Sequence, residues 1–306
     1  MPSDLFSDIL QLVGAQTVLA GGFAAGGPWA LHFPAPDKLK FAAVVKGVCW
    51  LRIEGEEQAI RVKTGDVALL CAKRPFVLAS DLALKPQDAK AVFYDQGKSF
   101  VTLGDGLDCV QLGGHIALNP TNGDFLASAL PPMILVRAES PYAADLKWLI
   151  EKLVREQTQE RPGAGIASSQ IGQLMFVELL RAHLAASGSF PVGWLRALGD
   201  SRLAPSLRLM HQAPERDWKL EELASECAMS RTTFSVRFKT SVGRTPFAYL
   251  IEWRMRLAER ALRESDLSVA AVGQSLGYTS ESAFSHAFKR VVGHAPRSYR
   301  ACATEE

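Results

Sequence analysis

The stretch LEELASECAMSRTTFSVRFKTSVGRTPFAYL, residues 220–250, recurs in altered form as VAAVGQSLGYTSESAFSHAFKRVVGHAPRSYR, residues 269–300. Each copy has a helical stretch, a short polar turn and a second helical stretch, which is the helix-turn-helix pattern. One copy is weak evidence, because short packed helix pairs occur in many folds. Two copies joined by a helical stretch over 246–263 predict one rigid unit that presents two helices to DNA. Seven residues recur identically fifty positions apart: Phe234/Phe284, Phe238/Phe288, Lys239/Lys289, Val242/Val292, Gly243/Gly293, Pro246/Pro296 and Tyr249/Tyr299.

The second helix of each copy is predicted to have one buried and one polar face. Phe234 and Phe238 are four residues apart, so they share a face, and Phe284 and Phe288 repeat that spacing. Ser230 is a good N-cap for the first of these helices. The opposite faces carry the candidate reading residues: Thr232, Ser235, Val236 and Lys239 in the first copy, and Glu281, Ser282, Ser285, His286, Lys289 and Arg290 in the second.

These side chains suit a DNA groove. Hydroxyls and histidine bond base edges, and valine contacts a thymine methyl group. Lys239, Lys289 and Arg290 suit phosphate better. The alternative is an ordinary solvated helix face, which is the more common origin of such a pattern in a single helix. The duplication favours the DNA interpretation for the pair.

Length and composition predict a soluble protein of two domains. The 306 residues are 48% apolar and 22% charged, with no run long enough for a membrane helix. The start MPSDLFSDIL lacks the features of a signal peptide, so a cytoplasmic location without membrane association is expected. The five cysteines are scattered and form no CxxC pair, which favours reduced thiols over a disulfide framework or a zinc site.

The net charge of +2 is unevenly distributed. Residues 201–306 contain 16 Lys/Arg against 12 Asp/Glu, and residues 1–200 contain 18 against 20. A basic C-terminal third agrees with phosphate binding. An excess of this size is also ordinary, so the charge supports the repeat without deciding the function.

The rest of the chain predicts an α+β organisation. A short helix is expected over 4–14, followed from about 28 to 120 by antiparallel strands of a barrel or sandwich. The predicted strand runs are FAAVVKGVCWLRI, QAIRVKTGDVALLCA, FVLAS, AVFYD and CVQLGGHIAL. Helices are expected over 143–158, 166–187 and 201–213. The predicted division is a first domain over 1–190, a linker over 191–202 and a helical domain over 203–306.

Residues 203–300 closely resemble the DNA-binding domain of the AraC/XylS family of transcription regulators. The segments MSRTTFSVRFKTSVGRTPFAYLIEWRMRLAERAL and LGYTSESAFSHAFKRVVGHAPRSYR carry the resemblance. It implies that the two units enter successive major grooves, and that promoter DNA and RNA polymerase are partners. Val236 stands where many members carry arginine, which removes a strong guanine-reading donor. The first helix is therefore expected to contribute shape and apolar contacts.

Residues 1–190 resemble the cupin-type sensor domain of a branch of the same family, through PWALHFP, VVKGVCWLRI and VKTGDVALLCAKRPFVLAS. A cupin enzyme needs several histidines and a carboxylate around a metal. This domain offers only His32 and His115 before residue 183, and Phe76 stands where many relatives carry histidine. No catalytic residue, metal or cofactor is therefore expected.

The signal is not identified by the sequence. Cys71 and Cys109 raise a redox hypothesis, against the alternative that both are small core residues. Aromatic residues either line a ligand cavity or form the barrel core; these are Trp29, Phe33, Trp50, Phe76, Phe93 and Tyr94. The candidate effector-binding residues are Trp29, His32, Trp50, Cys71, Phe76, Cys109 and His115.

A homodimer is expected, with the helices over 143–158 and 166–187 as its candidate interface. Leu146, Leu149, Ile150 and Leu153 form an apolar stripe on the first, and packing on the barrel is the alternative. Ile171, Leu174, Met175 and Leu179 form the apolar side of the second.

The sequence thus predicts a transcription regulator whose promoter binding responds to a small ligand or an oxidant. The alternatives are a cupin-like enzyme fused to a DNA-targeting domain and a thiol-based sensor.

Overall fold

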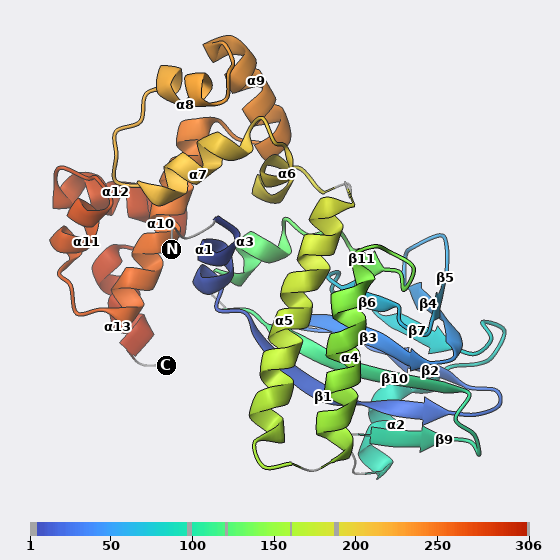
Figure 1. Cartoon of the computed structure of the whole chain (residues 1–306). Coiled ribbons are helices and arrows are strands. Elements are labelled where there is room, and N and C mark those ends of the chain that lie inside the picture. Colours follow the sequence, from blue (N-terminus) through green and yellow to red (C-terminus); the bar gives the residue numbers. More distant parts are fainter. Residues whose placement is uncertain (1–4, 97–99, 120–121, 160, 187–189, 305–306) are drawn as a thin grey trace. The chain divides into compact units, whose positions relative to one another are not determined.

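The computed structural model describes residues 5–96, 100–119, 122–159, 161–186 and 190–304. The chain forms two compact units that are not continuous in sequence. The sheet unit contains residues 15–118 and 130–188. The helical unit contains the segment up to Gly14, Asn119–Ala129 and residues 189–306. The chain therefore passes between the units four times (Figure 1).

Two sheets form the sheet unit. The six-stranded sheet has the order β11-β6-β3-β10-β1-β9, and the five-stranded sheet has the order β5-β4-β7-β2-β8. The strands are β1 (Gln16–Ala25), β2 (Ala30–Phe33), β3 (Leu39–Lys46), β4 (Val48–Ile53), β5 (Ile60–Lys63), β6 (Val67–Leu70), β7 (Phe76–Ala79), β8 (Gln87–Asp88), β9 (Phe100–Leu103), β10 (Cys109–Ala117) and β11 (Met133–Val136).

The core of this unit is built by side chains from both sheets. Phe23 on β1 and Leu70 on β6 pack in the same buried cluster as Leu51 on β4 and Leu78 on β7. In β4, residues alternate between buried and more exposed positions, as expected for a strand with one face on a core. The barrel or sandwich predicted from the strand pattern is confirmed by these two packed sheets.

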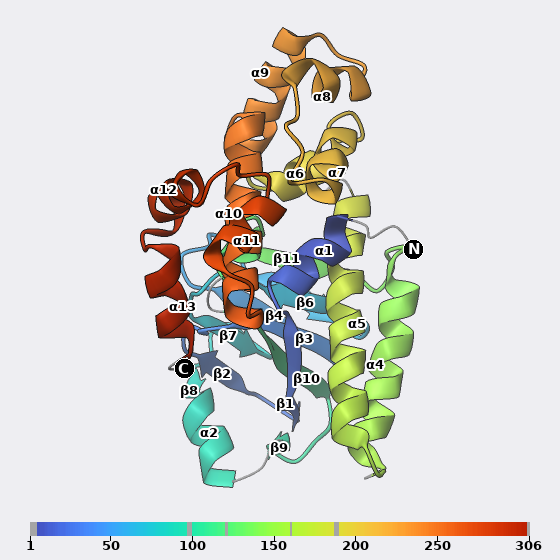
Figure 2. The same cartoon turned by 90° about the vertical axis from the view of Figure 1, so that its left-hand side faces the viewer.

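Two long helices, α4 (Ala143–Thr158) and α5 (Ala164–Ala185), lie side by side, and α5 packs on β1 and β11 of the six-stranded sheet (Figure 2). α5 lies very close to β1 at Gly172. A Cβ atom at this position would lie only 2.4 Å from Thr17 Cγ2. The Ser169 hydroxyl donates to the Thr17 carbonyl at 2.8 Å. Glycine at position 172 therefore permits the close approach of helix and strand.

The apolar stripe of α4 is used inside the chain. Leu146, Leu149, Ile150 and Leu153 are all buried in the single chain. They are therefore not available as the dimer interface considered from the sequence, and packing on the unit's own core takes its place. On α5, Ile171, Met175 and Leu179 are buried as expected, whereas Leu174 is exposed.

The helical unit contains the remaining helices, apart from α2 (Ala89–Gln96), which belongs to the sheet unit. Its elements are α1 (Leu5–Leu12), α3 (Gly123–Ala127), α6 (Trp194–Gly199), α7 (Ala204–Gln212), α8 (Leu220–Glu226), α9 (Arg231–Val242), α10 (Pro246–Glu264), α11 (Val269–Ser275), α12 (Glu281–Val292) and α13 (Pro296–Thr304). The long helix α10 contacts α9 in the first helix-turn-helix copy and α11, α12 and α13 in the second.

Some predicted elements differ from the structure. The AVFYD run forms part of helix α2 instead of a strand, because the Asp88 carboxylate accepts a hydrogen bond from the Lys90 backbone N–H at 2.9 Å and caps the helix start. Strands β1 and β11 and the short helix α3 were not among the predicted elements.

The predicted linker over 191–202 contains helix α6. Trp194, Leu195 and Ala197 are buried, and α6 packs on α7 and α9. The Gly193 N–H, directly before this helix, donates to the Ser241 carbonyl at 2.9 Å and ties the segment to the end of α9. The outer boundaries of the two predicted domains stay a prediction.

Candidate DNA interface and effector cavity

Helices α9 and α12 begin and end alike. The Ser230 hydroxyl accepts a hydrogen bond from Thr233 N at 3.2 Å, and the Ser280 hydroxyl accepts one from Ala283 N at 3.1 Å. Each helix ends at a glycine with positive φ, 81° at Gly243 and 91° at Gly293. Glycine adopts this left-handed backbone without a Cβ penalty, so both helices stop at the same point of the repeat.

The inner faces of both helices are apolar and fully buried. Phe234 and Phe238 have ring centroids 5.6 Å apart, and Phe284 and Phe288 have centroids 5.7 Å apart. The second phenylalanine of each pair also meets a tyrosine edge to face, Tyr249 at 5.9 Å and Tyr299 at 5.5 Å. These aromatic contacts fix each helix on its neighbours and orient its polar face outward.

The outer faces repeat the same exposure pattern. Thr232, Val236 and Lys239 are exposed on α9, with Ser235 half-buried beside them. On α12 the equivalent positions show the same pattern: Ser282, His286 and Lys289 are exposed, and Ser285 is half-buried. Arg290 is also exposed. The structure thus brings each predicted set together on one face of its helix.

Nearby charges modify these faces. The half-buried Glu281 carboxylate forms an ion pair with Arg297 at 2.9 Å, which partly neutralises the start of α12. Arg297 lies at the start of α13 with its side chain largely exposed, and the sequence reasoning did not select it. Its position directly after Pro296, a proline that can begin a helix, would have been the signal. Arg237 on α9 forms an ion pair with Asp200 at 2.7 Å.

A buried cluster of polar and aromatic side chains lies within the helical unit. His211 Nε2 lies 2.6 Å from the Tyr249 hydroxyl, and the His211 ring stacks on Trp253 with centroids 3.8 Å apart. Burial holds the pKa of His211 well below its usual value of 6.5. The same burial raises the pKa of Tyr249. The cluster therefore favours the neutral form of both side chains.

Helices α1 and α3, from the first half of the sequence, pack within this same unit. The Phe125 ring on α3 stacks on Trp194 at 5.5 Å and lies 6.2 Å from Trp253. Trp194 Nε1 donates to the Phe125 carbonyl at 3.0 Å. Helix α1 contacts α7 and α10. Two segments adjoining β1 and β10 thus form part of the core under the helix-turn-helix copies.

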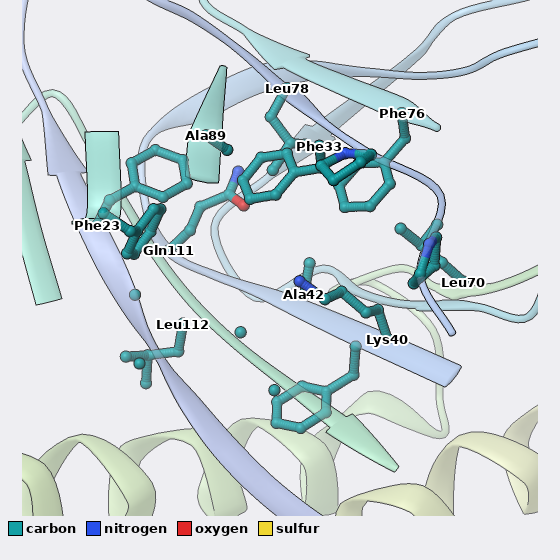
Figure 3. Close-up of a pocket in the computed structure, with 18 of the residues that line it drawn as sticks. Phe23, Phe33, Lys40, Ala42, Leu70, Phe76, Leu78, Ala89, Gln111 and Leu112 are labelled. Atoms are coloured by element: carbon teal, nitrogen blue, oxygen red, sulfur yellow. The ribbon is translucent and has the colours of Figure 1, made fainter. Parts of the chain in front are cut away.

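The sheet unit contains a cavity of about 550 Å³ (Figure 3). Its wall is mainly apolar and includes five phenylalanines, with Phe33 and Phe76 stacked in parallel at 4.7 Å. Lys40, Lys90 and Asp37 are its charged residues. Burial lowers the pKa of Lys40, Asp37 opposes this, and Lys90 lowers that pKa further. The aromatic side chains in the wall are Phe23, Phe33, Phe41, Phe76 and Phe93.

Of the seven predicted effector-binding residues, Phe76 lines this cavity. Trp29 is buried beside Phe23, and Trp50 lies under Arg61. Of the further aromatics considered for the cavity, Phe33 and Phe93 belong to its wall, whereas Tyr94 is 86% exposed. The described wall does not include the other predicted residues: His32, Cys71, Cys109 and His115. Sequence spacing identified some aromatic residues of the wall but not its polar ones.

The polar residue on the cavity floor is Gln111 on β10, which is 2% exposed. Its Nε2 donates to Cys49 Sγ at 2.8 Å. A hydrogen bond from Cys49 lowers the pKa of Cys109, burial opposes this, and the Gln111 amide lowers it further. The Gln111 Oε1 atom has no hydrogen-bond partner among the described residues. Gln111 was not selected from the sequence, where a single glutamine in a strand has no distinguishing pattern.

Cys71 and the histidines have other environments. Burial raises the pKa of the Cys71 thiol to about 12. Burial lowers the pKa of His115, and Lys38 and Lys40 add to that effect. Within the described part of the chain, no three His, Cys, Asp or Glu side chains are grouped as a metal site. None of its helices combines the length and hydrophobicity needed to span a bilayer.

This combination of a cupin-like sheet unit and a duplicated helix-turn-helix unit defines a class of transcription regulator. The Cupin family matches residues 4–185, and the Helix-turn-helix domain family matches residues 223–301. A putative AraC-like transcription regulator of Streptomyces antibioticus is 37% identical over 97% of this chain and 98% of its own length. The HTH-type transcriptional regulator AlkR of Acinetobacter baylyi is 31% identical over 90% and 91%.

Among solved structures, the DNA-binding domain of AdpA in complex with a target DNA is 35% identical over 33% of this chain and 91% of its own length, with a TM-score of 0.32. The chain belongs to the AraC-type transcription regulators with an N-terminal cupin domain, and it is a DNA-binding protein. The resemblance stated from the two motif segments is confirmed. Its relatives are regulators, which agrees with a role outside catalysis.

Proposed function

We propose that this regulator reads promoter DNA with the outer faces of α9 and α12 and responds to a small molecule held in the cavity of the sheet unit. The matched exposure of the two faces carries the first part of the proposal. Serine, threonine and histidine supply hydrogen bonds to base edges, and the exposed Val236 supplies an apolar contact. Lys239, Lys289 and Arg290 then bind phosphates.

The sorting of base contacts from phosphate contacts is tested on α12. His286→Ala is expected to lose about 1–3 kcal/mol of discrimination at one base pair of the operator. Lys289→Ala is expected to weaken all sequences similarly and to lower the salt dependence by about one released counterion. An operator obtained by selection from a random DNA library, titrated at several salt concentrations, provides both readouts. Lys85→Ala, an exposed lysine of the sheet unit, is the matched control; equal losses of both kinds for the two α12 variants would contradict the assignment.

The link between cavity and DNA is proposed to run through the chain itself. Strands β1 and β10 both line the cavity and pair with each other from Gln16↔Ala117 to Ala25↔Cys109. At that first end, β1 follows helix α1, and β10 continues into the segment that contains α3. Because α1 and α3 are built into the helical unit, a shift of these strands would strain the Phe125–Trp194 contact. This route supplements the linker over 191–202 that was predicted from the sequence.

Coupling is reciprocal, so operator DNA should also affect the cavity strands. Binding of operator is expected to change amide hydrogen exchange in β10 around Gly113 and Gly114. Phe125→Leu, which removes the ring but keeps an apolar side chain, is expected to reduce that change at least twofold while operator is still bound. The exchange is measured by mass spectrometry on the full-length protein. A β10 response of unchanged size in the variant would exclude this route.

A ligand is favoured over an oxidant as the signal. Oxidant sensing needs an accessible thiolate. Burial disfavours the thiolate at Cys71, and Cys109 is only 2% exposed. The enzyme alternative has no support from the relatives.

We further propose that the protein is a cytoplasmic homodimer. It is also proposed to contact RNA polymerase and to activate transcription. These proposals rest on the family resemblance, and sedimentation of the purified protein tests the dimer.

A further inference from the structure

The floor of the cavity has a polar atom without a protein partner. Gln111 lies nine-tenths buried or more, and its side chain extends between Phe23 and Phe33 into the cavity (Figure 3). A buried carbonyl without a hydrogen-bond donor has lost its hydration without compensation, so a ligand that donates to it is favoured. Most of the surrounding wall is apolar, and no described side chain donates a hydrogen bond to the Oε1 atom.

A neighbouring thiol occupies one end of the Gln111 amide. The Gln111 Nε2 group donates to Cys49 Sγ at 2.8 Å. The Oε1 atom at the other end is buried and has no hydrogen-bond partner among the described residues. The carbonyl oxygen is thus the end that faces the cavity, and it requires a hydrogen-bond donor from a ligand.

The charged residues of the cavity wall are less buried than Gln111. Among the wall residues, Gln111, Phe76 and Leu78 are buried, whereas Lys90 and Asp37 are exposed and Lys40 is half-buried. Lys40 and Lys90 line the same cavity and repel each other, and this repulsion lowers the pKa of Lys40. Asp37 offsets only one of these two charges. An anionic group beside the two lysines would relieve the repulsion.

The body of the ligand is constrained by the phenylalanines of the wall. Aromatic rings favour aromatic partners in stacked or edge-to-face contact, with a gain beyond the area buried. A cavity of about 550 Å³ falls within the usual range of small-molecule sites.

We infer that the cavity binds a small aromatic acid that also carries a hydroxyl group, with the hydroxyl donating to Gln111 Oε1 and the carboxylate lying near Lys40 and Lys90. This inference rests on the proposed effector role of the cavity and names the chemical class of its ligand. Gln111 distinguishes hydroxylated from plain aromatic acids, and the two lysines distinguish acids from neutral phenols.

Three probes with one carbon skeleton test both contacts: phenylpropanoate, its para-hydroxy derivative and para-propylphenol. Calorimetric titration of the full-length protein is expected to show the hydroxy acid binding on the order of tenfold to a hundredfold more tightly than phenylpropanoate, because the latter leaves Gln111 unpaired. The preference should fall below about threefold in Gln111→Leu, with Gln111→Met as a second variant if the first does not fold. Lys40→Met should reduce the preference for the hydroxy acid over para-propylphenol and leave the hydroxyl preference intact.

Equal binding of phenylpropanoate and its hydroxy derivative to the unsubstituted protein would overturn the inference, as would binding of none of the probes. A hydroxyl preference that survives in a folded Gln111 variant would do the same. Operator affinity is measured on the same samples to separate the two proposals. Tight, Gln111-dependent probe binding without any change in operator affinity supports the ligand class and contradicts the effector role. Operator binding that is intact while all probes fail overturns the ligand class alone.

Discussion

Phe238→Ala is expected to lower the free energy of unfolding of the helical unit by about 3–5 kcal/mol, the cost of deleting a fully buried aromatic side chain. Phe238 is 0% exposed and contacts both Phe234 and Tyr249. The cavity left behind would lie between α9 and α10, so operator binding should be lost together with the fold. Urea unfolding followed by circular dichroism at several temperatures measures the loss.

Two further variants make this test specific. Val236 lies on the outer face of the same helix and is 63% exposed. Val236→Ala is expected to change the free energy of unfolding by no more than about 0.5 kcal/mol. Phe288, at the equivalent position of the second copy, is also 0% exposed and contacts the equivalent aromatic residues, Phe284 and Tyr299. Phe288→Ala should therefore lower the free energy of unfolding about as much as Phe238→Ala. A small effect of both phenylalanine variants would show that the repeat is not held together by its aromatic core.

The second large effect is a loss of stability in mild acid caused by His211. Its pKa is held well below 6.5 in the folded protein by burial, while the unfolded chain titrates near 6.5. Below that pH the unfolded state binds more protons, so the free energy of unfolding falls as pH falls. The stability that the neutral His211 contributes is fully present above pH 6.5. Below that pH the free energy of unfolding declines by up to about 1.4 kcal/mol per pH unit.

His211→Gln keeps a polar partner for the Tyr249 hydroxyl but does not titrate in this range. The variant is expected to show a flatter dependence of α10 opening on pH between 7.5 and 5.5 (roughly the window set by the unfolded histidine), measured by hydrogen exchange. Comparing slopes removes the effect of Glu259, whose pKa is raised by burial and which acts in the opposite direction. Parallel slopes for the two proteins would assign the acid sensitivity to other groups.

The amino-acid pattern alone determined the duplicated helix-turn-helix unit. Its signals are local: a serine cap, two phenylalanines four residues apart and a glycine stop occur within twelve to fourteen residues, and each acts through contacts along one helix. The polar faces of α9 and α12 follow from the same spacing. The sheet-rich fold of the first part was also predicted, because alternating strands and turn residues are read over short windows, and the resemblance to known sensor domains identified it as cupin-like.

Tertiary structure decided the features that join distant segments. Gln111 becomes a candidate ligand contact only because β4 and β10 bring Cys49 and Cys109 together behind it. Phe125 joins the core of the helical unit through Trp194 and Trp253, which are about 70 and 130 residues away along the chain. The stripe on α4 was visible in the sequence, but whether its own chain or a second chain buried it was not. Local patterns state which face of an element must be buried, whereas the partner that buries it is set by packing across the whole chain.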